Sequence, residues 1–318
     1  MQTRNAAGLF RLIVVPLDGS AFAERALPLA ASVATAAASP LHLVRVAAPP
    51  ALGTELYGAV VLNAEAVEEM RREAERSLRA TADRVAAGTG LAVTPVVIDS
   101  GLPAALVDYV RGSGADLVVM TTHDRGRLEQ LLLGSVAASV VRRGGAPVLL
   151  VRADEESPPG DRPPKLRRLL IPLDGSEFAA QVIPHALKIA TVNHMEITLL
   201  SVVDPTLGMA SQAMGEGAST SDPSRSAGQA ADPAATFLER AAESLRDRAL
   251  TVRTRVVSHR QAPDAIVMYA GEQGIDLIAM TTHGRSGLGR LVAGSVAEAV
   301  LRTSPAPVLM YRPVREKV

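Results

Sequence analysis

An internal duplication constrains the fold of this chain more than any other feature. Four motifs occur twice in the same order, and the last three keep the same spacing in both copies. They are IVVPLDGS and LLIPLDGS (13–20, 169–176), ADLVVMTTH and IDLIAMTTH (115–123, 275–283), GSVA (134–137, 294–297), and APVL (146–149, 306–309). Their period is too long for a solenoid repeat, so each copy is expected to be a whole domain.

The segment between the two copies has a different composition. Residues 154–164 read DEESPPGDRPP, a charged run with four prolines. Such a run is typical of a linker, because proline cannot continue a helix or a central strand. The sequence therefore predicts a first domain at 1–152, a linker at 153–166 and a second domain at 167–318.

Within each copy, short apolar runs alternate with longer segments rich in alanine and charged residues. In the first copy this pattern predicts strands near 11–17, 40–47, 91–98, 115–122 and 147–151, and helices near 20–38, 64–88, 103–113 and 135–143. Strands that are apolar throughout are covered on both faces. The expected fold class is α/β, with two tandem, doubly wound, five-stranded parallel-sheet domains. In the second copy, 204–235 is rich in Gly, Ser, Ala, Asp and Pro and is expected to be a mobile loop.

Composition excludes several functions. The 33 Lys and Arg residues balance the 33 Asp and Glu residues, and there is no Trp. A nucleic-acid partner is not expected, because such proteins carry a basic excess and stacking aromatics. Cys is absent, which removes disulfides and thiolate chemistry. The first apolar run is too short to span a membrane, so a cytoplasmic protein without a membrane partner is expected.

Two of the duplicated motifs follow strands. Pro-Leu-Asp-Gly-Ser follows the first strand of each copy, and Met-Thr-Thr-His with a glycine-containing loop follows the fourth. In an open α/β sheet, ligands bind beyond the carboxyl ends of the strands, where the strand order reverses. If strands one and four are neighbours, both motifs face one crevice.

These motifs resemble the universal stress protein family over nearly the whole chain, twice. Its ATP-binding members carry Gly-x2-Gly-x9-Gly-Ser/Thr. The second copy has Thr281 in place of the first glycine, then Gly284, nine residues, Gly294 and Ser295. The first copy lacks two of the three glycines, since Thr121 and Asp124 stand in their places. The resemblance implies an adenine-nucleotide alpha hydrolase-like fold and ATP as ligand, with or without Mg²⁺.

Carried onto this sequence, the resemblance gives two candidate nucleotide sites, of which the second is expected to be the stronger. The second site comprises Pro172, Leu173, Asp174, Val202, Met280, Thr281, His283, Gly284, Arg285, Gly294, Ser295 and Val296. The first comprises Pro16, Leu17, Asp18, Val46, Met120, Thr121, Arg125, Gly134, Ser135 and Val136. By resemblance, Val202 offers backbone groups to adenine.

The residue chemistry agrees with this assignment. Gly284 and Gly294 lack a Cβ, so a polyanion can approach the backbone. Gly294 and Ser295 open a helix whose N–H groups favour a phosphate. Asp174 is suited to accept hydrogen bonds from ribose hydroxyls.

Structural alternatives stand beside each of these roles. Ser135 and Ser295 are equally suited to capping helices, and Asp18 and Asp174 to capping the first helix of each copy. Gly284 also suits a simple turn. His123 and His283 have no partners at ligand spacing and are expected to be loop hydrogen-bonders, so no protein side chain is expected to hold a metal. The arginines at 71–72, 76 and 79 and their neighbouring glutamates read as a solvated helix face.

The sequence leaves three functions open. It holds no Walker lysine motif, no dinucleotide fingerprint and no nucleophile beside a base. The leading hypothesis is an ATP-binding stress or signalling module. The alternatives are a slow Mg²⁺-dependent ATPase and a nucleotide-free scaffold. By resemblance, the closing strands at 147–151 and 307–311 pair the two domains as a pseudo-dimer within one chain, which could also form a homodimer.

Overall fold

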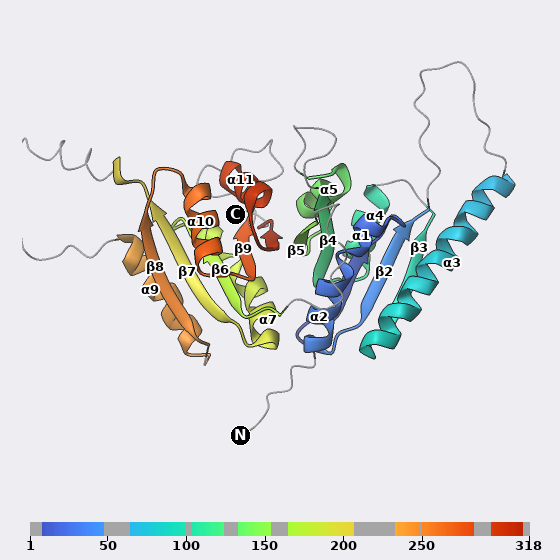
Figure 1. Ribbon diagram of the computed structural model, residues 1–318, viewed down its shortest axis with the longest axis horizontal. Coiled ribbons are helices and arrows are strands. Elements are labelled where there is room, and N and C mark those ends of the chain that lie inside the picture. Colours follow the sequence, from blue (N-terminus) through green and yellow to red (C-terminus); the bar gives the residue numbers. More distant parts are fainter. Residues whose placement is uncertain are drawn as a thin grey trace, which may run out of the picture. The chain divides into compact units, whose positions relative to one another are not determined.

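The structure of the chain is a computed structural model (Figure 1). It describes residues 8–47, 64–99, 103–123, 133–153, 165–206, 233–248, 250–282 and 294–313. It divides into two compact units, one comprising residues up to Lys165 together with Leu309–Arg312, and the other comprising Leu166–Val308. Below, the first unit and the second unit are the two repeats, before and after the boundary between Lys165 and Leu166. Each unit has its own set of parallel strands and covering helices.

In the first unit, strands and helices alternate along the chain. They are β1 (Ile13–Pro16), α1 (Ala21–Glu24), α2 (Leu27–Ala37), β2 (Leu41–Val46), α3 (Ala64–Thr89), β3 (Val93–Ile98), α4 (Ala104–Gly112), β4 (Leu117–His123), α5 (Ser135–Arg143) and β5 (Val148–Ala153).

The second unit repeats this order. Its elements are β6 (Arg168–Pro172), α6 (Glu177–Ala180), α7 (Ile183–Asn193), β7 (Glu196–Val203), α9 (Pro233–Arg246), β8 (Val252–Ser258), α10 (Ala262–Glu272), β9 (Leu277–Thr281), α11 (Ser295–Thr303) and β10 (Val308–Tyr311).

The strand order is the same in both units and confirms the predicted fold class. It is β3-β2-β1-β4-β5 in the first and β8-β7-β6-β9-β10 in the second. In the first unit, β1 runs parallel to β2 on one side and to β4 on the other. In the second, β6 lies in the same way between β7 and β9. The order therefore reverses at β1 and at β6, where an open parallel sheet binds ligands.

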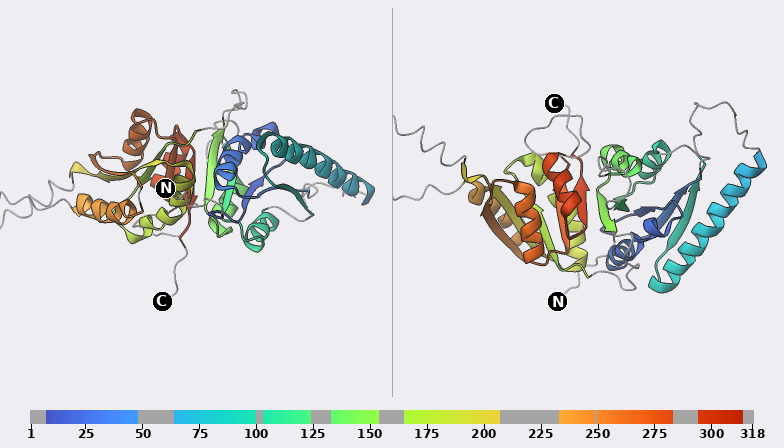
Figure 2. Two further views of the ribbon diagram at one scale, coloured as in Figure 1. Left: turned by 90° about the horizontal axis from the view of Figure 1, so that it is seen from below. Right: turned by 45° about the horizontal axis from the view of Figure 1, so that its top comes forward.

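Helices cover both faces of each sheet. In the first unit α2 contacts α3, and α4 contacts α5. Figure 2 (left) shows these pairs on opposite faces of the sheet. Central strand residues such as Ile13, Leu43 and Leu117, and Leu169 and Leu277 in the second unit, are completely buried. This is why the central strands β1, β4, β6 and β9 are largely apolar rather than alternating.

The helix predicted at 20–38 is wrong as one continuous element. The structure has α1 and α2, separated by Arg25 and Ala26. Pro28 lies in the first turn of α2, and having no N–H it cannot donate to the carbonyl of Glu24. The second unit breaks in the same way at Pro184.

Most of the loop predicted at 204–235 lies outside the described residues. Among the helices in the described ranges, none is long and apolar enough to cross a membrane.

Candidate functional site

The turn after the first strand of the second unit is built by Asp174, Gly175 and Ser176. Oδ1 of Asp174 accepts hydrogen bonds from the Ser176 N–H (3.0 Å) and hydroxyl (2.6 Å). The Ser176 hydroxyl oxygen in turn accepts from the N–H of Ala179 (3.1 Å) and caps α6. Gly175 has φ +83°, a left-handed conformation that favours glycine. The motif residues therefore fix the shape of the turn.

The first unit has the same turn with nearly the same geometry. Oδ1 of Asp18 accepts from the Ser20 N–H (2.8 Å) and hydroxyl (2.6 Å), and Ser20 caps α1 through Ala23. Gly19 has φ +89°. The alternative that Asp18 and Asp174 cap the first helix of each copy is therefore wrong. The serine caps the helix, and the aspartate orients the serine.

The fourth strand of the second unit brings a second group of residues to the same end of the sheet. Because β9 pairs with β6, Thr281 and the fully buried Thr282 lie near the Asp174 turn. Gly294 donates its N–H to the carbonyl of Thr282, and this contact places the start of α11 beside the end of β9. The predicted neighbourhood of strands one and four is confirmed.

The helices α11 and α5 both begin without a side-chain cap. Gly294 and Gly134 are the N-cap residues, and Ser295 and Ser135 are the first helical residues behind them. The serines therefore do not cap these helices, which was the structural alternative for them. A helix start without a side-chain cap leaves N–H groups available to an anion, and the helix dipole favours negative charge there.

These elements surround a cavity of about 260 Å³ in the second unit. Nine of the predicted site residues line it, namely Pro172, Leu173, Asp174, Val202, Met280, Thr281, Gly294, Ser295 and Val296. The other three, His283, Gly284 and Arg285, lie outside the described residues. Asp174 is the one charged side chain among the described residues that line this cavity.

The equivalent cavity of the first unit is larger, about 440 Å³. Nine predicted residues line it too, namely Pro16, Leu17, Asp18, Val46, Met120, Thr121, Gly134, Ser135 and Val136. Arg125 lies outside the described residues. Unlike the second cavity, this one has a basic side chain in its described lining, that of Arg45.

Sequence reasoning missed the residues that the covering helices bring to the cavities. Ala262 and Ile266 of α10 line the second cavity, while Met70 and Ala74 of α3 line the first. No motif marks these positions. Arg45 was also missed, although it directly precedes the predicted Val46.

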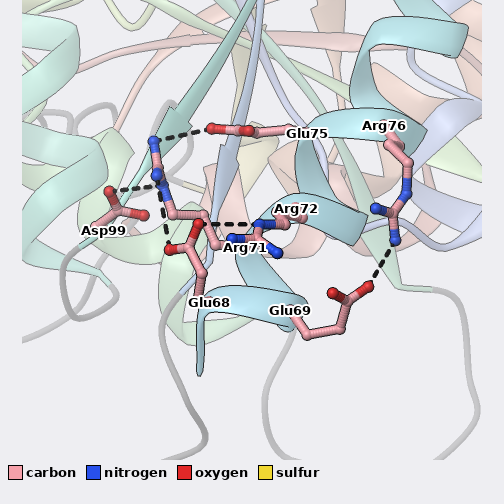
Figure 3. Close-up of polar contacts among 7 residues, drawn as sticks. All are labelled: Glu68, Glu69, Arg71, Arg72, Glu75, Arg76 and Asp99. Atoms are coloured by element: carbon pink, nitrogen blue, oxygen red, sulfur yellow. Dashed lines mark hydrogen bonds and ion pairs between the residues drawn. The ribbon is translucent and has the colours of Figure 1, made fainter. Parts of the chain in front are cut away.

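The basic residues of α3 form a charged outer face, as the helical spacing predicts. Arg71 pairs with Glu75 (2.9 Å) and, beyond the end of β3, with Asp99 (3.1 Å), as Figure 3 shows. Arg76 pairs with Glu69 (2.9 Å). A hydrogen bond and the charge of Arg76 lower the pKa of the exposed Glu69 carboxyl. Exposed pairs of this kind contribute little to stability.

Within the described ranges, no group of three or more His, Cys, Asp or Glu side chains is placed to hold a metal ion.

Comparison with known proteins identifies relatives over the whole chain. The model of the "Universal stress protein family" matches residues 9–152 and 165–312. A universal stress protein of Mycolicibacterium smegmatis is 26% identical over 310 residues, covering 95% of this chain and 97% of that protein. One from Mycobacterium tuberculosis is 27% identical over 311 residues, covering 94% and 96%.

A solved structure shows the same fold over nearly the whole chain. The crystal structure of a universal stress protein from Archaeoglobus fulgidus has a TM-score of 0.66 at 18% identity and covers 98% of this chain and 100% of that one. A universal stress protein solved in complex with cAMP covers 48% of this chain and 100% of its own, with a TM-score of 0.35 at 19% identity.

Proposed function

Because the chain belongs to the universal stress protein family, we propose that it is an adenine-nucleotide-binding stress or signalling protein whose stronger ATP site lies in the second repeat. The observation that carries this proposal is the convergence of three elements on one cavity. They are the Asp174 turn, the end of β7 at Val202, and the uncapped start of α11 at Gly294.

Each part of the cavity suits one part of a nucleotide. Leu173, Val202 and Ile266 provide apolar walls for the adenine ring. Asp174 is suited to accept hydrogen bonds from ribose hydroxyls, because a carboxylate has about four lone-pair sites. The N–H groups at the start of α11 favour the phosphates. A cavity with apolar walls and a few convergent polar groups is the usual form of a small-molecule site.

The inequality of the two sites rests on the loops that follow β4 and β9, which lie outside the described residues. In the first loop, from Asp124 to the Gly-Ser motif, the charges of two acidic residues balance those of two arginines. The second loop has Arg285 and Arg290 and no acidic residue. A carboxylate about 4 Å from a phosphate charge costs roughly 4 kcal/mol at an effective dielectric constant near 20. This weakens binding by roughly a thousandfold.

Calorimetric titration of the full chain with ATP tests this proposal. The titration is run in a chelating buffer, because bound Mg²⁺ between Asp124 and a phosphate would reverse the sign of their interaction. We expect one dominant site, lost in Gly284→Asp and nearly unchanged in the first-repeat control Gly134→Asp. Two sites of equal affinity, or loss in the control variant instead, would contradict the proposed order of the sites.

A phosphate-release assay separates this function from that of an ATPase. The described carboxylate of the second cavity, Asp174, is held in its turn by Ser176, and the sequence offers no Walker lysine. We therefore expect turnover far below the ~10 s⁻¹ that is typical of enzymes. Sustained hydrolysis near that rate, lost in Asp174→Asn, would show that the protein is an enzyme.

A further inference from the structure

The two cavities differ in one strand residue, which is Arg45 in the first and Ser201 in the second. Pro16 pairs with Val44 in the first unit and Pro172 with Leu200 in the second, so the next residue of each strand occupies the same position. Arg45 lines its cavity, whereas Ser201 is 6% exposed and is absent from the described lining of the other. The first cavity thus has a cation where the second has a small, buried hydroxyl.

The guanidinium of Arg45 lies flat against the turn that carries Asp18. A Cβ added to Gly19 would meet the Cζ, Nη1 and Nη2 atoms of Arg45, each at 2.8 Å. Three equal distances place that added Cβ over the face of the guanidinium, so the plane of this group faces the side of Gly19 on which a side chain would lie. The absence of a side chain at Gly19 is therefore what allows the cation to approach the turn.

This guanidinium has no partner among the described residues. No hydrogen bond or ion pair joins Arg45 to any residue in the described ranges. The neighbouring carboxylate, Asp18, uses Oδ1 to bind Ser20 instead. Arg45 therefore presents its N–H donors beside the turn that, under the proposed function, faces the ribose.

We propose that the first cavity binds an adenosine nucleotide that carries a phosphate on its ribose, at the 2′ or 3′ position, and that Arg45 holds this phosphate. This inference rests on the proposed function, which places the ribose at Asp18. The planar donors of arginine match a phosphate, often through two parallel hydrogen bonds. An arginine beside the ribose is also how dinucleotide sites accept a ribose phosphate. The second cavity, with Ser201, suits an unmodified ribose.

The test compares three isomers on the full chain with its second site disabled by Gly294→Asp. The ligands are ADP, adenosine 2′,5′-bisphosphate and adenosine 3′,5′-bisphosphate. The two bisphosphates carry the same charge, one unit more negative than ADP when fully ionised, so a difference between them reflects the position of the ribose phosphate alone. We expect one ribose-phosphorylated isomer to bind at least about tenfold more tightly than ADP, the size typical of a charge-assisted hydrogen bond. Arg45→Ser, which copies the second repeat, removes this preference, and Arg45→Lys retains only part of it.

The variant in which the first site is disabled, instead of the second, provides the matched control. In Gly134→Asp, which disables the first site, the second cavity is expected to bind ADP at least as tightly as either bisphosphate. Circular dichroism of each variant verifies that the fold is intact.

The possible failures are distinguishable. Equal affinity of the first cavity for ADP and both bisphosphates, or a preference that survives Arg45→Ser, overturns the inference and leaves the proposed function standing. The inference is also overturned, and the proposed function still stands, if ATP binds at the second cavity and no nucleotide binds at the first. If neither cavity binds any adenine nucleotide, the proposed function itself fails.

Discussion

At the scale of single residues, the Asp-Gly-Ser turn shows why one motif serves both folding and binding. Ser176 connects the Asp174 carboxylate to the first turn of α6 through two hydrogen bonds. The same contacts hold the carboxylate at the edge of the cavity. The side chain that a ligand would meet is therefore oriented by the fold before any ligand arrives.

Removal of this cap should destabilise the second repeat. Ser176→Ala deletes the hydroxyl that accepts from Ala179, and loss of an N-cap costs about 1 kcal/mol. Urea unfolding of the full chain measures the change. The control Ser244→Ala alters an exposed serine in the last turn of α9 and should leave the free energy of unfolding nearly unchanged. A loss of equal size in both variants would contradict a capping role.

A second residue-scale prediction concerns His42. Its Nδ1 lies 2.7 Å from the Tyr109 hydroxyl oxygen, and burial lowers the pKa of the imidazole below its ordinary value of 6.5. The unfolded chain therefore takes up this proton at a higher pH than the folded one. The contribution of His42 to stability is present above about pH 6.5 and is lost as the pH falls towards the lowered folded pKa.

The variant His42→Thr tests this, since Thr198 occupies the equivalent place in the second repeat. The drop in unfolding free energy between pH 7.5 and pH 5.5 should be smaller in the variant than in the parent chain. Urea titrations at the two pH values give both differences. An equal drop in both proteins would show that His42 does not contribute.

At the scale of elements, the helices α2 and α7 end in the same unusual way. Their C-cap residues, Ala38 and His194, have φ values of +49° and +53° and are exposed. This left-handed conformation closes the helix, and glycine adopts it at least cost. Both repeats thus keep a strained non-glycine residue at the same helix end.

Replacement of that residue should stabilise the protein. Ala38→Gly relieves the left-handed strain and should raise the free energy of unfolding by about 0.5–1 kcal/mol. Ala36→Gly is the matched control inside α2, where glycine should cost about 1 kcal/mol instead. Thermal and urea unfolding distinguish the two signs. Destabilisation by Ala38→Gly would mean that its backbone carries no strain.

At the scale of the whole molecule, the arrangement of the two repeats stays a prediction. By resemblance to the family, the closing strands 147–151 and 307–311 are expected to pair the repeats within one chain. Small-angle X-ray scattering should then give a single-peaked distance distribution and a radius of gyration near 20 Å, about that of one compact body of 318 residues. A double-peaked distribution with a larger radius would indicate two separate lobes.

The sequence by itself determined the repeat, the fold class and the strand-end motifs. Those features depend on local chemistry: apolar runs make covered strands, and Asp174, Gly175 and Ser176 build a turn with their own side chains and backbone. Eighteen of the 22 predicted site residues lie in the described ranges, and all of these line the two cavities. The break before Pro28 was also present in the sequence, but the apolar pattern on either side concealed it.

Only the tertiary structure decided which other side chains reach the cavities. Met70 and Ile266 enter from helices far along the chain from the strand-end motifs, and His42 meets Tyr109 across 67 residues. In the sequence, nothing distinguishes Arg45 from other polar residues in strands. Only the structure shows that its guanidinium lies against Gly19, which has no side chain. Such contacts depend on which elements pack together. No local pattern encodes that, because a side chain's surroundings are set by residues distant in the sequence.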